Sequence, residues 1–466
     1  MSRASASRRI DGNRLTLQFD GPHAFDAWLE AIARAERFIH FENYILRDDS
    51  VGRSFRDALV ERARAGVQVR VVHDWVGCWA TGRRYWRPYR EAGVEVRAFN
   101  PPSIRDPFGL FQRDHRKLVC VDGEIAFVGG FCVGEEWTGK GDDPPWRDTG
   151  VEVQGPGAAQ LGSTFERIWA ELGSPIPSDC QVDPERVTLA GELPVWIIEG
   201  LPWRSRVYRV TQLMAATCRE RLWITDPYFV APRPVREALA GAAEDGVDVR
   251  ILVPGHNNWP WVGSLSRGGY RFLLESGVRI FEWQGPMIHA KTSVADGIWA
   301  RIGSSNLNVA SLLGNWEVDV GVLDADFALQ VEGLFLADQA SSLEVLLPGR
   351  RPMEDTSMVT PLEPESVLSG GLSRWIRTGT GGQTLTIGDL VRAGSQFGDA
   401  IAGHRTLRRE DRAVLGTVAV LVLVAAVVSG FAPRLIGWAV AVLLGWFGLV
   451  LSLRYLVQAF KKGEGE

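Results

Sequence analysis

The sequence predicts an α/β protein made of two copies of one unit, followed by a hairpin of two transmembrane helices. Three observations support this class. Residues 10–348 contain an internal repeat, the same polar motif stands in each copy, and two uncharged apolar segments lie near the end of the chain. Hydrophobic residues make up 45% of the chain and charged residues 23%, which is ordinary globular composition and excludes wholesale disorder.

The repeat divides this region into two similar halves. The segment AGVQVRVVHD at 65–74 matches DGVDVRILVP at 245–254. Phe25, Trp28 and Ile32 recur at the spacing of one helix face, and short apolar runs that end in turn residues indicate buried strands. Each half should therefore form one mixed sheet with helices on its faces.

We expect five segments along the chain. They are a disordered N-terminus (1–9), a first half (10–180), a second half (181–348), a linker with a possible interfacial helix (349–404) and a transmembrane hairpin with basic flanks (405–466). Residues 386–402 place apolar side chains on one helical face. That pattern is typical of a helix lying on a bilayer, or of one packed on the soluble body.

The predicted hairpin consists of residues 413–433 and 435–453, which contain no charge. At about 1.5 Å per residue, each can cross a hydrocarbon layer of about 30 Å. A buried core hairpin is the alternative. Basic residues at 405–412 and 461–462 flank the pair, so the positive-inside rule places both termini and both halves on the cytoplasmic side.

Charge and cysteine content exclude several classes of protein. The net charge is −5, and residues 404–466 carry eight basic against four acidic residues, so the rest of the chain is more acidic still. An acidic body argues against a nonspecific nucleic-acid binder. The five cysteines form no C-x-x-C pair, which argues against a disulfide scaffold and a zinc ribbon.

Each half contains the motif H-x-K-(x)4-D, followed after six intervening residues by Gly-Gly or Gly-Ser. The residues are His115, Lys117 and Asp122 before Gly129 and Gly130, and His289, Lys291 and Asp296 before Gly303 and Ser304. His and Lys two apart on a strand point to the same face. Because Asp-Gly is also a turn signal, the two aspartates are candidates either for catalysis or for a turn.

The residue types favour phosphoryl chemistry that needs neither metal nor cofactor. One histidine would attack phosphorus while the other protonates the leaving oxygen, and the lysines would neutralise the phosphate. Small and polar residues on the return strands, Gly130, Ser304 and Asn306, are the candidates for binding the phosphate.

An acid is needed on the second ring nitrogen of each histidine, where it orients the ring. One acid follows in each half, Asp148 after His115 and Glu317 after His289. A surface charge or a strand-end ion pair is the alternative for both acids. These residues by themselves leave open which histidine is the nucleophile.

The paired motifs resemble the phospholipase D superfamily. The GSSN segment at 303–306 and the NWE segment at 315–317 are similar to those of bacterial cardiolipin synthases. The resemblance as a whole covers about residues 10–348. The resemblance implies pseudo-twofold symmetry and one active site between the halves. It also implies that His115 is the nucleophile and His289 the general acid, and that the enzyme works in the bacterial inner membrane.

The chain departs from the family pattern at two positions. Cys132 stands where the family has Asn beyond the Gly-Gly pair, and a thiol is a weak donor. Asn308 stands where cardiolipin synthases often have Asp. The first departure concerns one contact to the phosphate, which is lost or supplied by another group, and the second concerns the head-group preference.

The expected function is that of a membrane-bound phosphatidyltransferase, which makes cardiolipin from phosphatidylglycerol and releases glycerol. Its partners would be phosphatidylglycerol, other anionic phospholipids and the bilayer, without nucleic acid. The alternatives are phospholipase D hydrolysis, a nuclease or other phosphodiesterase, and an inactive membrane scaffold. An apolar loop at 101–111 either admits acyl chains or is simply packed. The sequence leaves the oligomeric state open.

Overall fold

The protein is seen in a computed structural model, which describes residues 1–103, 112–141, 143–183, 187–202, 204 and 206–347. Most of the loop at 101–111, the linker at 349–404 and the predicted hairpin at 405–466 lie outside these residues. Among the helices that are described, none has the length and apolar character that a membrane span needs.

The first half alternates strands and helices before it ends in a run of antiparallel strands. Its elements are β1 (Ile10–Gln18), α2 (Gly21–Arg34), β2 (Phe38–Asn43), α3 (Ser50–Arg64), β3 (Gln68–Asp74), α4 (Arg83–Glu91), β4 (Glu95–Phe99), β5 (Lys117–Val121), β6 (Ile125–Gly129), β7 (Gly150–Gln154) and α5 (Pro156–Glu171).

The second half repeats this order with additions. Its elements are β8 (Leu193–Gly200), α6 (Arg206–Thr217), β9 (Arg221–Thr225), α7 (Arg233–Glu244), β10 (Asp248–Pro254), α8 (Pro260–Gly268), α9 (Tyr270–Glu275), β11 (Arg279–Trp283), β12 (Thr292–Ala295), β13 (Trp299–Gly303), α10 (Val309–Leu313), β14 (Glu317–Leu323), α11 (Ala325–Ala340) and β15 (Ser342–Val345).

The N-terminal residues differ from the expectation of disorder. Residues Ser2–Ser5 form a short helix, α1, which contacts α6 and β8. The indole Nε1 of Trp196 donates to Ser2 Oγ at 3.0 Å, and Ser5 is buried. The polar, basic composition of this segment gave no sign of such packing, because the contact is made with a distant strand.

The strand order of the two halves confirms the predicted duplication. The first half has the order β1-β7-β6-β5-β2-β3-β4, and the second has β8-β14-β13-β12-β9-β10-β11, with β15 added at the edge. In both halves the three outer strands β2–β4 and β9–β11 run parallel, while the hairpin strands run antiparallel.

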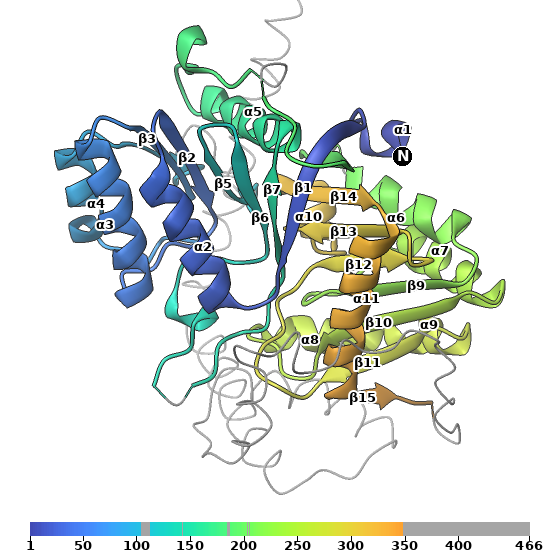
Figure 1. Cartoon of the computed structure of the whole chain (residues 1–466). Helices are drawn as coiled ribbons and strands as arrows, with labels where there is room; N and C mark the ends of the chain where they lie inside the picture. The colour runs from blue at the N-terminus through green and yellow to red at the C-terminus, as the bar shows by residue number, and fades with distance from the viewer. Residues whose placement is uncertain (104–111, 142, 184–186, 203, 205, 348–466) are drawn as a thin grey trace, which may run out of the picture. The chain divides into compact units, whose positions relative to one another are not determined.

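The expectation of one separate sheet per half is corrected by the pairing of β1 with β8. These two equivalent strands pair antiparallel and join the halves into a continuous fifteen-stranded sheet (Figure 1). Antiparallel pairing of equivalent strands is the arrangement that a twofold axis between the halves produces. It uses backbone groups at the sheet edge, which carry no signature in the sequence.

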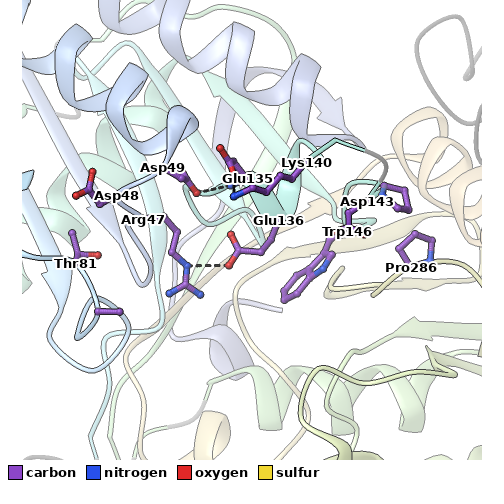
Figure 2. Close-up of a pocket in the computed structure, with 13 residues that line it drawn as sticks. Arg47, Asp48, Asp49, Thr81, Glu135, Glu136, Lys140, Asp143, Trp146 and Pro286 are labelled. Atoms are coloured by element: carbon purple, nitrogen blue, oxygen red, sulfur yellow. Dashed lines mark hydrogen bonds and ion pairs between the residues drawn. The ribbon is translucent and has the colours of Figure 1, made fainter. Parts of the chain in front are cut away.

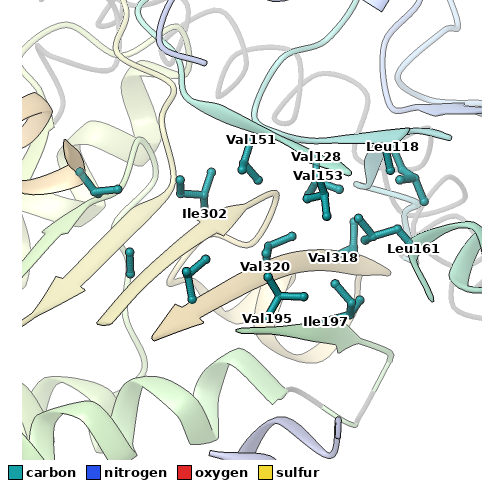
Figure 3. Packing of buried hydrophobic residues seen from close by; sticks show 14 of the residues in the cluster. Leu118, Val128, Val151, Val153, Leu161, Val195, Ile197, Ile302, Val318 and Val320 are labelled. Carbon is teal, nitrogen blue, oxygen red and sulfur yellow. The ribbon is translucent and has the colours of Figure 1, made fainter. Parts of the chain in front are cut away.

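Three hydrophobic cores hold the helices on the sheet. Helices α2, α3 and α4 cover one face of the first half, and α6, α7 and α9 cover the equivalent face of the second. The third core lies between the halves and includes α5 and α11. Figure 3 shows strand residues of both halves meeting in it, among them Val128 and Val151 from the first and Ile302 and Val320 from the second.

A fully buried asparagine fixes the joint between the halves. The register of β1 against β8 shifts between Ile10 and Asn13. At this shift the Asn13 amide donates to the carbonyls of Ile10 at 2.8 Å and Leu193 at 3.0 Å, and its Oδ1 accepts from the N–H of Gly157 at 2.6 Å. One side chain therefore ties together the irregular strand, its partner and the first turn of α5.

Replacing Asn13 with leucine should destabilise the protein by about 2–4 kcal/mol, because three buried backbone groups lose their partner. The free energy of unfolding in urea measures this loss. Asp11→Asn, at an exposed position of the same strand, is the control and should change it little. Equal stability of Asn13→Leu and the unchanged protein would contradict the role given to this amide.

Candidate active site

Both histidine motifs lie at the same end of their half-sheets. Lys117 begins β5 and pairs with Asn43, the last residue of β2. In the second half Thr292 begins β12 and pairs with Thr225, the last residue of β9. Because β2 and β9 belong to the parallel part of the sheet, the motifs stand where the carboxyl ends of parallel strands meet, a common place for ligands.

Backbone pairing across the halves brings the two motifs together. The N–H of His115 donates to the carbonyl of Trp316 at 3.0 Å. In the reciprocal contact, the N–H of His289 donates to the carbonyl of Arg147 at 2.6 Å. Each histidine is thus fixed to the residue that precedes an acid of the opposite half, Asp148 or Glu317.

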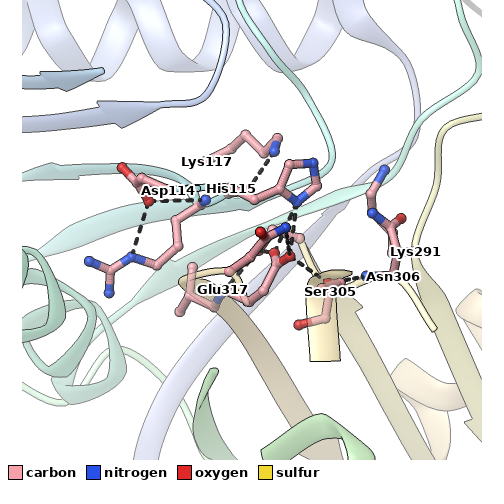
Figure 4. Close-up of polar contacts among 12 residues, drawn as sticks. Asp114, His115, Lys117, Lys291, Ser305, Asn306 and Glu317 are labelled. Carbon is pink, nitrogen blue, oxygen red and sulfur yellow. Dashed lines mark hydrogen bonds and ion pairs between the residues drawn. The ribbon is translucent and has the colours of Figure 1, made fainter. Parts of the chain in front are cut away.

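The imidazoles contact these acids directly. His115 Nδ1 lies 3.0 Å from Glu317 Oε2, and His289 Nδ1 lies 2.7 Å from Asp148 Oδ2. Figure 4 shows the Glu317 carboxylate beneath the His115 ring. The structure therefore brings all four predicted residues together, but it pairs each histidine with the acid of the other half, not with the acid that follows it in its own half.

Further hydrogen bonds hold the two carboxylates in place. Glu317 accepts from Ser304 Oγ at 2.6 Å, from Ser311 Oγ and from Asn315 Nδ2. Burial opposes ionisation of Glu317, but His115 and Lys117 outweigh it and lower the pKa of the carboxyl.

Asp148 is held in a different way. It accepts from the indole Nε1 of Trp137 and from the N–H of Thr149, both at 2.8 Å. Burial again opposes ionisation, and the nearby His289 and Lys291 lower the Asp148 pKa against it. Both acids are therefore ionised at neutral pH. Each accepts a hydrogen bond from its histidine, whose Nδ1 carries the proton.

The two lysines are fully buried beside the histidines. Lys117 Nζ donates to the carbonyl of His115 at 2.5 Å, and Lys291 Nζ lies 2.9 Å from Nε2 of His289. Burial lowers the Lys291 pKa to about 8, although Asp148 partly opposes the shift. Two ammonium groups without water around them form a strong site for a phosphate.

Burial and the nearby lysines also act on the histidines. Burial is the first cause of the lowered pKa of His115, and Lys117 and Lys291 add to it. The pKa of His289 falls to about 3 for the same reasons, burial first and then Lys291. Among these protein groups alone, both rings are therefore neutral at pH 7.

The three predicted phosphate-binding residues have different surroundings. A side chain at Gly130 would place its Cβ 2.0 Å from Asp148 Oδ1, so glycine is needed there for the acid to fit. Ser304 is fully buried and bonded to Glu317. Asn306 is buried, and its Oδ1 has no hydrogen-bond partner among the described residues. Of the three, Asn306 is the one with a free polar atom.

Cys132 occupies the position equivalent to Asn306 and is also buried in the site. Burial raises the pKa of its thiol, while Lys117 and Lys291 pull the pKa down by a smaller amount. The first half therefore presents a protonated thiol where the second presents an amide.

The structure does not bring Asp122 and Asp296 to the histidines. Both have positive φ, 54° and 50°, in the turns at the far ends of their hairpins. The Asp122 carboxylate accepts from three successive backbone N–H groups at the start of β2, each at 2.8 Å. Asp296 does the same before β9, at 2.9–3.0 Å. These contacts support a role in the turn, which the sequence offered as the alternative to catalysis for both aspartates.

Several aromatic residues at the site were not predicted as site residues. Tyr44 and Tyr228 lie edge-on against His115 and His289, with ring centroids 5.0 and 5.8 Å away. Trp137 and Trp146 pack on His289 at 5.6 and 5.9 Å. The equivalent positions of the two tyrosines in the repeat were a usable signal; the tryptophans had none.

A cavity of about 620 Å³ opens beyond Trp146 (Figure 2). Its lining is rich in carboxylates, part of which are paired, as in the contact of Arg47 with Glu136 at 2.9 Å and of Lys140 with Glu135 at 2.8 Å. Because Trp146 packs on His289 from one side and lines this cavity from the other, the cavity adjoins the site.

Comparison with known proteins places this geometry in a family. The family described as "Cardiolipin synthase, PLD-like domain" matches residues 28–169 and 210–339. A cardiolipin synthase A of Pseudomonas aeruginosa is 35% identical over 354 residues, covering 75% of this chain and 71% of the relative. A cardiolipin synthase of Geobacillus sp. is 34% identical, covering 72% and 68%.

A solved structure shares the fold. The phosphatidylserine synthase of Haemophilus influenzae aligns with a TM-score of 0.60 at 15% identity, covering 74% of this chain and 90% of that one. At this identity the likeness concerns the fold alone. The two repeated matches, the extent of the sequence identity and the paired motifs show that the chain belongs to the cardiolipin synthase family of phospholipase D-like proteins.

Proposed function

We propose that the protein is a phospholipase D-type phosphatidyltransferase that makes cardiolipin from phosphatidylglycerol. The observation that carries this proposal is the pair of histidines, each held by a carboxylate of the opposite half, beside two buried lysines in a chain of this family. No described residues form a group of three or more ligands that could hold a metal ion.

The first step of the proposed reaction is attack by His115 on phosphorus. Its Nδ1 is engaged with Glu317, so Nε2 is the nitrogen that can form the bond. A P–N bond forms, the bond from phosphorus to the glycerol oxygen breaks, and His289 gives its proton to that oxygen. The assignment of nucleophile and general acid follows the family resemblance, because each histidine contacts a carboxylate through Nδ1 in the same way.

The second step transfers the phosphatidyl group. His289, now neutral, takes the proton from a hydroxyl of a second lipid, and the oxygen of that hydroxyl attacks phosphorus. The P–N bond breaks and His115 is regenerated. With phosphatidylglycerol as the acceptor the product is cardiolipin; with water it would be phosphatidic acid.

His289 takes up the proton that it must donate from solvent, when the charge of the substrate enters the site. In the empty site, burial and Lys291 keep the His289 pKa near 3. A phosphodiester brings a negative charge between the lysines, and an opposite charge nearby favours the protonated ring. Substrate binding and protonation of the general acid His289 are therefore coupled.

The cavity beyond Trp146 offers space for a polar head group next to the phosphorus. Its carboxylates can accept hydrogen bonds from glycerol hydroxyls. A hydroxyl bound beside the intermediate competes far better with water than one in solution.

We further propose that residues 405–466 anchor the protein in the bacterial inner membrane, with both termini and both halves on the cytoplasmic side. The uncharged segments at 413–433 and 435–453 and their basic flanks support this placement. A membrane anchor keeps the site among lipid head groups, which raises the local concentration of both substrates.

A product assay tests the function. Purified full-length protein with labelled phosphatidylglycerol in mixed micelles should yield cardiolipin and free glycerol, with and without EDTA. Plasmid DNA in a parallel reaction should stay intact. Phosphatidic acid as the main product would assign hydrolysis, nicked DNA a nuclease, and no reaction a scaffold.

The roles of the histidines can be separated with an activated substrate. His115→Ala and His289→Ala should each lower turnover of phosphatidylglycerol by at least about a thousandfold. A phosphatidyl ester of p-nitrophenol needs no acid for its leaving group, so His289→Ala should still form an adduct on His115, detectable by mass spectrometry. His23→Ala, at an exposed histidine, is the control. An adduct in His115→Ala would reverse the two roles.

The lowered pKa of Lys291 predicts that kcat/KM depends on pH. This lysine must be charged to bind phosphate, and its pKa in the empty site is about 8, so kcat/KM should fall as pH rises through about 8. Bound phosphate raises that pKa, so kcat should fall only at a higher pH. Lys291→Arg should be slower at every pH because the guanidinium is larger, yet it should lose this alkaline decline. An unchanged decline would assign it to another group.

A further inference from the structure

Four tryptophans are exposed in the described part of the chain, and all lie in two loops or at their ends. Trp75 and Trp79 follow β3, and Trp259 and Trp261 follow β10, the last at the start of α8. Trp79 is 74% exposed, Trp259 55% and Trp261 50%. Exposing several of the largest apolar side chains is unusual for a protein surface that meets only water.

The two loops are equivalent in the repeat. Trp79 stands five residues after Asp74, the last residue of β3, and Trp259 stands five residues after Pro254, the last residue of β10. The two halves have otherwise diverged in sequence around these positions. An exposed tryptophan is thus present at the same place on both sides of the pseudo-twofold axis.

Both loops are hydrogen-bonded to the tyrosines that pack on the site histidines. In the first, Cys78 Sγ contacts the carbonyl of Tyr44, whose ring lies against His115. In the second, Asn258 Oδ1 accepts from the hydroxyl of Tyr228 at 2.8 Å, and that ring lies against His289. The exposed tryptophans therefore flank the site from both halves.

The charge beside the loops is suited to an anionic surface. Helix α4, which follows the first loop, carries four arginines and one glutamate, and all four arginines are exposed. Helix α8 in the second loop carries no acidic residue, and Leu265 on it is 56% exposed. Tryptophan prefers the head-group region of a bilayer, and arginine is attracted to anionic lipid.

We propose that these two loops, with Trp79, Trp259 and Trp261 at their centre, form a docking surface that seats the site on an anionic phospholipid bilayer. The inference rests on the proposed function, which supplies the lipid substrate. The surface brings the two histidines to the head groups, so that a lipid reaches them without leaving the bilayer. It acts in addition to any anchor elsewhere in the chain.

The test compares full-length protein with the variant Trp79→Ala, Trp259→Ala, Trp261→Ala. Both are reconstituted in vesicles of phosphatidylglycerol and brominated phosphatidylcholine, which quenches tryptophan at the bilayer. Turnover is measured on these vesicles and on short-chain phosphatidylglycerol below its micellar concentration. The matched control is Leu189→Ala, Ile298→Ala, two similarly exposed apolar residues outside both loops.

We expect the ratio of vesicle to monomer turnover to fall by roughly tenfold or more in the triple variant and to stay within about twofold in the control. The bromine quenching of the unchanged protein should exceed that of the triple variant. Equal ratios and equal quenching would overturn the docking surface while the proposed function stands.

Two other outcomes separate the proposals. Protein that turns over neither substrate, yet keeps the tryptophan-dependent quenching, would refute the proposed function and support the surface. If a second copy of the chain covers the tryptophans, their quenching by aqueous acrylamide would fall as protein concentration rises without lipid. Bromine quenching would then be the same in the unchanged protein and in the triple variant. That result would overturn the bilayer as the occupant.

Discussion

The contact of each site histidine with a carboxylate of the opposite half is the interaction on which the site depends. Glu317 reaches His115, and Asp148 reaches His289, only because β1 pairs with β8 and the backbone of each motif pairs with the segment before the other half's acid. Neither half alone holds an oriented histidine. The joint at Asn13 and the core between the halves therefore serve the chemistry as much as the stability.

Electrostatic balance explains how so many ionisable groups can be buried together. Two carboxylates and two ammonium groups lie out of water, and both histidines are neutral before a substrate adds its charge, so the charges offset one another. Removing water makes each remaining interaction stronger. A phosphodiester adds one negative charge, and protonation of a histidine compensates it.

The two halves are nearly equivalent in fold, but the residues around their two histidines differ. Glu317 is held by two serine hydroxyls and an amide, whereas Asp148 is held by an indole and a backbone N–H. Asn306 stands in the second half at the position that Cys132 has in the first. A reaction in which one histidine attacks and the other donates a proton has no use for identical halves, so these differences are where the two roles can be distinguished by experiment.

By itself the sequence determined the duplication, the two H-x-K motifs, the two acids and the two Asp-Gly turns, because strand periodicity, residue spacing and Asp-Gly turns are local properties. It left open whether Asp122 and Asp296 act in catalysis or in the turns, which the contacts of their carboxylates decided. Tertiary structure decided that the half-sheets join through β1 and β8, and that the acids are exchanged between the halves. It also placed Tyr44, Tyr228, Trp137 and Trp146 against the histidines. These features depend on contacts between residues far apart in the chain, where backbone edges and ring faces meet without any pattern that local spacing records.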